Sequence, residues 1–188
     1  MELIQYEIAL NDYILEANEI IAHLRTIPYP EFKCIEIDCN AIESKWPKWQ
    51  NRLIMSGVTV DSRVLYYITI KSNHSPARIK EIVKKRKAYK RNSKKYIALP
   101  KVNDSIDSKV LYVGKCNSNF NSRFIHHMGK GSRKTYSLQL VDWAAEMDLQ
   151  LCLYYAIVEI PNDKIHYLEL VETILHKKLS PILGRSGH

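Results

Sequence analysis

Five polar side chains from three separated segments could together carry out acid–base and phosphate chemistry. Tyr66 and Tyr112 lie within apolar, strand-like segments. Arg123 and His127 are four residues apart, so on a helix they share one face. Glu172 lies at the edge of an apolar helical stripe, which suits a carboxylate at a cleft rather than in open solvent. A guanidinium can clamp a phosphate, and a phenol or an imidazole can transfer a proton.

Each of these side chains also has a structural explanation. Strand tyrosines commonly pack half buried, an arginine and a histidine can form a solvated helix face, and a single helical glutamate usually lies at the surface. The order and spacing of the whole set favour a functional site over these separate explanations.

Residues 71–95 form a strongly basic segment. Eleven Lys and Arg residues stand there against one acid, Glu81, which gives the segment a charge of +10 in a chain whose total is +8. Such a concentration fits the phosphates of a nucleic acid or another polyanion. A solvated basic helix face is the alternative, and a membrane-surface helix is disfavoured because the segment has few large apolar residues.

The elements that position these residues can be predicted from apolar spacing. Alternation and β-branched content predict strands over residues 63–71, 109–115 and 149–160, with a possible short strand over 33–39. Three- and four-residue spacing predicts helices over residues 3–26, 76–92, 119–128, 136–147 and 163–179. The expected fold is an α+β domain with a small central antiparallel three-stranded sheet flanked by helices, in which the first two strands form a hairpin.

Composition limits the class of protein. A hydrophobic content of 46% is enough for a core, and no apolar run approaches the roughly 20 residues that a membrane helix needs. The N-terminus lacks the basic start of a signal peptide, so we expect a soluble cytoplasmic protein without membrane partners. The four cysteines show neither a CxxC pair nor a matching histidine cluster, which predicts reduced, buried thiols rather than structural zinc.

The polar set resembles the GIY-YIG nuclease family over residues 62–188, two thirds of the chain. The family's Gly-Ile-Tyr-x-Ile motif corresponds to "VLYYI" with Tyr66 at its centre, and its Tyr-Ile-Gly motif to "YVG" beginning at Tyr112. The family arginine and histidine fall on Arg123 and His127. The family's metal-binding glutamate, nine residues before a proline, falls on Glu172.

The chain departs from the family pattern at three places. The first motif lacks its glycine, and the family asparagine that follows the proline is replaced by Gly184, so that Arg185, Ser186 or His188 would have to take its role if the role is kept. The interval between the two tyrosine motifs is unusually long because it contains the basic segment. We therefore expect an N-terminal helical extension over 1–61 and a DNA-gripping, basic helical insertion over 72–108 within the nuclease-like domain.

The resemblance implies a metal-dependent DNA endonuclease with a single Mg²⁺ or Mn²⁺ ion on Glu172. Arg123 is then expected to clamp the scissile phosphate, and His127 to orient phosphate or relay a proton. Tyr66 is expected to take the proton of the attacking water, with Tyr112 as the alternative base, and Lys115 and Arg123 would lower the phenol's pKa by favouring phenolate.

The implied partner is double-stranded DNA. The residues expected to contact its phosphates are basic side chains of the insertion and of the segments around the site: Lys84, Lys85, Arg86, Lys87, Lys115, Lys130, Arg133 and Lys134. The added elements suggest a restriction or defence-type enzyme, although an enzyme of repair or of a mobile element would use the same core. The rival hypothesis is a non-catalytic nucleic-acid-binding protein that retains the fold. Residues 1–61 are expected to serve either homodimerisation or DNA recognition.

Overall fold

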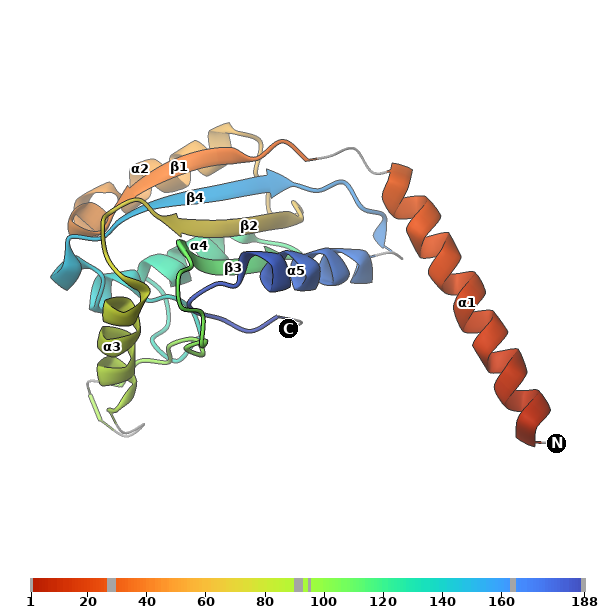
Figure 1. The fold of residues 1–188 in the computed structure, drawn as a ribbon. Helices are drawn as coiled ribbons and strands as arrows, with labels where there is room; N and C mark the ends of the chain where they lie inside the picture. The colour runs from red at the N-terminus through yellow and green to blue at the C-terminus, as the bar shows by residue number, and fades with distance from the viewer. Residues whose placement is uncertain (1, 27–29, 90–92, 95, 163–164, 187–188) are drawn as a thin grey trace.

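The computed structural model describes residues 2–26, 30–89, 93–94, 96–162 and 165–186. Its centre is an antiparallel sheet of β1 (Lys33–Asp38), β2 (Val64–Ile70), β3 (Val110–Cys116) and β4 (Gln150–Ile157), in the order β1-β4-β2-β3 (Figure 1). The α+β class is confirmed, but the expectation of three strands is wrong by one. The fourth strand is β1, a short edge strand whose alternation buries only Ile35 and Ile37.

The two tyrosine motifs pair as the predicted hairpin. In the register of β2 with β3, Tyr66 lies opposite Gly114, and Ile68 lies opposite Tyr112. Because side chains alternate along a strand, Tyr66 and Tyr112 both project from the same face of the sheet. Their rings lie 6.0 Å apart between centroids.

Helices cover both faces of the sheet. On the face that carries Tyr66, α2 (Ile42–Met55) and α4 (Phe120–Met128) close the main core. On the other face, Leu65 packs with Leu168 of α5 (His166–Leu179) in a smaller cluster. Residues 30–61, expected within a helical extension, therefore contribute β1 and α2 to the common sheet and core. Among the described helices, α1 (Glu2–Thr26) is the one that extends away from the sheet and the other helices (Figure 1).

The basic insertion contains one helix, α3 (Pro76–Lys87), which begins where the Ser75 side chain accepts a hydrogen bond from the Arg78 backbone N–H. Ile79, Ile82 and Val83 anchor its inner face in the core. The helix expected over residues 136–147 is absent. Two short 3-10 turns, Leu140–Asp142 and Ala145–Met147, replace it, because Gln139 before them and Asp148 after them adopt left-handed backbone conformations that interrupt a helix.

The C-terminal segment after α5 lies along β3. The backbone N–H groups of Ile182 and Leu183 donate to the carbonyls of Val110 and Leu111, both at 2.9 Å. On its other side, the Ile182 carbonyl accepts from the Asn103 N–H at 2.9 Å, and Val102 forms a β-bridge with Leu183. The segment therefore sits between the sheet edge and the end of the insertion.

The cysteines differ in part from the expectation of free thiols. Cys34 on β1 and Cys152 on the neighbouring β4 form a disulfide, whereas Cys39 and Cys116 are free. None of the helices in the described ranges has the length and apolar character of a membrane-spanning segment.

Candidate active site

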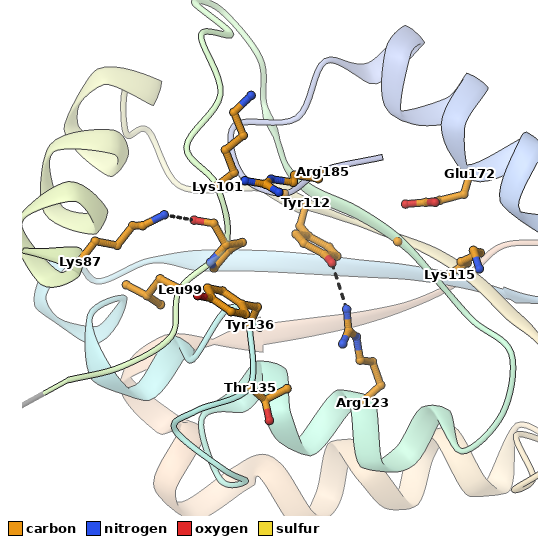
Figure 2. A pocket seen from close by; sticks show the side chains of 13 residues that line it. Lys87, Leu99, Lys101, Tyr112, Lys115, Arg123, Thr135, Tyr136, Glu172 and Arg185 are labelled. Carbon is orange, nitrogen blue, oxygen red and sulfur yellow. Dashed lines mark hydrogen bonds between the residues drawn. The ribbon is translucent and has the colours of Figure 1, made fainter. Parts of the chain in front are cut away.

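A pocket of about 570 Å³ opens beside β3 and gathers side chains from distant parts of the sequence (Figure 2). Six of its lining residues are charged. Five of these are cations and one is a carboxylate: Lys87, Lys101, Lys115, Arg123, Arg185 and Glu172. The pocket therefore presents a strongly positive surface with a single acidic group, a composition suited to an anionic ligand.

Arg123 reaches this pocket from α4. The helix starts at Asn119, whose side chain accepts a hydrogen bond from the Ser122 N–H, and ends at Gly129 in a left-handed conformation. From the second turn, the Arg123 guanidinium donates through Nε to Tyr66 Oη at 3.3 Å and through Nη2 to Tyr112 Oη at 3.2 Å. The two phenols therefore hold the guanidinium plane.

His127 completes a buried network behind Arg123. Its Nδ1 accepts a hydrogen bond from the Leu138 backbone N–H at 3.2 Å, so the ring proton lies on Nε2, which donates to Tyr66 Oη at 2.8 Å. Burial, followed by the nearby charge of Arg123, lowers the pKa of His127 well below its usual value. The imidazole is therefore neutral at pH 7 and orients Tyr66.

Tyr66 lies too deep to act as expected. It is completely buried and does not line the pocket, whereas Tyr112 does. Burial, followed by the proximity of the Tyr112 phenol, raises the pKa of Tyr66 well above its usual value, and the opposing effect of Arg123 is smaller. Contrary to expectation, the pKa of Tyr66 is raised overall, although Arg123 acts on it in the expected direction. Tyr66 accepts two hydrogen bonds and positions Arg123, so Tyr112 is the phenol placed to meet a ligand.

The environment of Arg123 favours the charged form of its guanidinium. The proximity of Tyr66 is the main influence that raises the pKa of Arg123, and it outweighs the effect of burial. The side chain stays cationic across the accessible pH range, as a phosphate clamp requires.

Two glycines allow the close packing around Tyr112. A Cβ on Gly114 would lie 2.7 Å from Tyr66 Oη and 2.8 Å from Tyr112 Cε1. Gly184 has a φ of +111°, and a Cβ there would lie 2.9 Å from Tyr112 Cε2. At the position of the family asparagine, the Tyr112 ring therefore occupies the space that a side chain would need. The neighbouring Arg185 lines the pocket instead, and His188 lies outside the described residues.

Glu172 extends from α5 into the same pocket (Figure 2) and is 4% exposed. The other glutamate of α5 is Glu169, one turn earlier and partly exposed. Its Oε1 lies 4.0 Å from the Lys115 Nζ. Within the described ranges, no group of three or more His, Cys, Asp or Glu side chains could hold a metal ion together. A buried single carboxylate in a pocket open to water fits an ion such as Mg²⁺, which retains most of its own waters.

The residues expected to contact DNA fall into three groups. Lys87 lines the pocket, with its Nζ donating to the Pro100 carbonyl at 2.9 Å, and Lys115 lines it as well. Lys84, Lys85 and Lys134 are exposed on the outer surface, and within the described residues none of them forms an ion pair with a carboxylate.

The remaining three candidates are ion-paired on the surface. Arg86 pairs with Glu146, Lys130 with Glu43, and Arg133 with Asp142 at 2.9 Å. Such pairing reduces the positive charge these residues offer to a phosphate.

Sequence reasoning missed several pocket residues. Lys101 comes from the loop after α3, and Thr135 and Tyr136 come from the loop after α4. No local pattern marks them, because they meet only when the insertion and the C-terminal segment fold beside β3. For Arg185 the sequence did offer a signal, because this residue is adjacent to Gly184, the position of the family asparagine.

The fold and the pocket rest on contacts within this chain alone. The chain matches no protein-family model, and neither a curated protein nor a solved structure is similar enough to count as a match.

Proposed function

We propose that the protein is a metal-dependent DNA endonuclease with a GIY-YIG-like core. The observation that carries the proposal is the convergence of Tyr112, Arg123 and Glu172, from β3, α4 and α5, on one pocket whose other charged residues are all cations. Hydrolysis of a phosphodiester requires charge neutralisation, an oriented water and help for the leaving oxygen. The three residues supply a group suited to each requirement.

Arg123 is the phosphate-binding group of this mechanism. Its Nε and Nη2 are held by the two phenols, which leaves Nη1 and one Nη2 proton for the non-bridging oxygens of the scissile phosphate. Lys115 and Arg185 on the pocket wall add charge for the neighbouring phosphates. The guanidinium arrives already oriented, which reduces the entropy lost when the transition state forms.

Tyr112 is the group that contacts the attacking water. Its Oη lies in the pocket wall beside Arg123 Nη2, so a water bonded to this oxygen lies close to the bound phosphate. The phenol orients this water, and in its phenolate form it would accept the water's proton and become a neutral phenol. Tyr66 and His127 act through Arg123 and Tyr112 as positioning residues.

Glu172 is the residue that would hold a divalent ion. When bound, the ion would neutralise charge on the leaving oxygen. The carboxylate's burial and its place on the pocket wall favour this role over that of an ordinary surface glutamate.

The proposal is tested by cleavage of supercoiled plasmid with Mg²⁺ or with EDTA. Wild-type protein is expected to nick the DNA only with the metal, and Glu172→Gln is expected to lower the rate at least ~100-fold. Glu159→Gln, at an exposed position between β4 and α5 and outside the pocket lining, is the control and should stay within about threefold of wild type. Metal-independent cleavage, or full activity of Glu172→Gln, would refute the proposal.

The chemistry of the pocket also supports the rival function, a DNA-binding protein without activity. Two observations favour it: Gly184 stands in place of the family asparagine, and Tyr66 is buried with a raised pKa. Wild-type protein that binds duplex DNA but cuts no substrate with Mg²⁺ or Mn²⁺ would establish this alternative. If cleavage occurs, sequencing the DNA ends separates a restriction-type enzyme, with fixed sites, from one that recognises DNA structure.

A further inference from the structure

α1 carries an apolar face that projects into solvent. Figure 1 shows the helix extending away from the sheet and the other helices. Its side chains at Tyr6, Leu10, Tyr13, Ile14 and Ile21 are between 44% and 70% exposed. In proteins a helix gains most of its stability by packing its apolar face, and a stripe of large apolar side chains is normally covered by a partner.

The stripe repeats with the spacing of a two-helix coiled coil. Positions 3, 10, 17 and 24 are Leu, Leu, Ala and Leu, and positions 6, 13 and 20 are Tyr, Tyr and Ile. This alternation of three- and four-residue steps runs through three heptads without a break. A repeat of 3.5 residues stays on one side of a helix only when the helix winds around another helix. Ile14 and Ile21 widen the stripe on one flank.

We propose that α1 pairs with α1 of a second copy of this chain, forming a two-chain coiled coil. The inference stands independently of the proposed nuclease activity. It gives residues 1–26 a role in homodimerisation, one of the two roles that the sequence left open for the N-terminal region.

The acidic side chains of α1 suggest one competing occupant. The helix carries Glu2, Glu7, Asp12, Glu16 and Glu19 but only one arginine, so a basic surface such as that of α3 would attract it. α3 offers no apolar surface on which the stripe could pack, however, because its large apolar residues Ile79, Ile82 and Val83 are already buried in the body. A second α1 offers a matching stripe of the same length and spacing.

The charge of α1 makes the two arrangements distinguishable. Two like-charged helices repel one another, and salt screens this repulsion, so added salt should maintain or strengthen the α1–α1 pair. An acidic helix on a basic surface would instead be released by salt.

The experiment is sedimentation equilibrium of the full chain over a range of protein and salt concentrations. Wild-type protein is expected to reach twice its 21.9 kDa mass, with a dissociation constant on the order of 1 μM for a coiled coil of three heptads. Leu10→Glu with Ile14→Glu places charge in the stripe and should weaken the dimer at least ~100-fold. Both residues are about half exposed in the single chain, so the body should fold unchanged.

The matched control is Ile8→Glu with Leu15→Glu. These residues are 55% and 63% exposed on the opposite side of α1. The dimer dissociation constant of this double variant should therefore stay within about threefold of the wild-type value. Three outcomes would overturn the proposal: a wild-type monomer throughout, equal effects of the two double variants, or dissociation by salt. The measurement needs neither DNA nor metal, so its failure is separate from any failure of the nuclease proposal.

Discussion

The buried phenol of Tyr66 should be needed for stability and positioning, whereas the pocket phenol of Tyr112 should be needed for chemistry. Tyr66→Phe removes the oxygen that accepts from His127 Nε2 at 2.8 Å and from Arg123 Nε at 3.3 Å. The imidazole N–H is then left buried without an acceptor, which costs about 1–3 kcal/mol. In a protein of this size each kcal/mol lowers the melting temperature by about 2–4 °C.

The effect of Tyr66→Phe on catalysis should be moderate. Arg123 keeps its bond to Tyr112 Oη at 3.2 Å, so its orientation is loosened rather than lost. We expect the cleavage rate to fall about 10- to 100-fold. Tyr112→Phe should show the converse pattern, with a rate at least ~100-fold lower and a free energy of unfolding changed by less than about 1 kcal/mol, because water can replace its oxygen at the pocket wall.

The assay combines urea unfolding with single-turnover plasmid cleavage. Tyr67→Phe is the matched control, because Tyr67 is the next residue of β2, lies on the other face of the sheet and is partly exposed. The assignment would be refuted if Tyr66→Phe abolished cleavage while leaving the free energy of unfolding unchanged, since Tyr66 would then be the base. Full activity of Tyr112→Phe would refute it equally.

Three further predictions follow from the same pocket. Gly184→Asn, which restores the family residue, should lower the melting temperature and not increase cleavage, because its Cβ would lie 2.9 Å from Tyr112 Cε2; a faster enzyme would contradict this. Arg185→Ala should weaken DNA binding and lower the slope of log affinity against log salt by about 1, as measured by fluorescence anisotropy; an unchanged slope would exclude a phosphate contact. The native pKa of His127 lies below its unfolded value, so the unfolded state binds more protons as pH falls, and wild-type stability should be complete above about pH 6.5 and decline below it by at most ~1.4 kcal/mol per pH unit. His127→Gln should flatten that decline in urea unfolding between pH 7 and pH 5, and an unchanged slope would assign it to other groups.

The placement of Arg123 and His127 could be predicted because helix geometry is local. A spacing of four residues puts both side chains on one face wherever the helix docks. Strand alternation likewise predicts that Tyr66 and Tyr112 project from the same face of the hairpin. The sequence could not distinguish their depths, since Tyr66 is buried by Phe120 of α4, whose ring centroid lies 4.9 Å away.

Features that depend on distant contacts were beyond sequence reasoning. Alternation over residues 33–39 predicted β1 only as a possible short strand, and its place in the central sheet depends on β4, more than 100 residues later, which pairs with it. The disulfide of Cys34 with Cys152 depends on the same pairing. Apolar spacing alone predicted a helix over residues 136–147, but the buried Gln139 bonds through its side chain to the Ser132 and Thr135 carbonyls and begins a turn instead.

The C-terminal segment along β3 also determines how the sheet can associate with other chains. An open edge strand is a template for β-strand addition and aggregation. Here Ile182 and Leu183 already bond to β3, and their other side bonds to the end of the insertion. Deleting residues 181–186 would therefore affect both the pocket and the sheet. It would remove two residues of the pocket wall and would also expose the edge of β3 to intermolecular sheet formation.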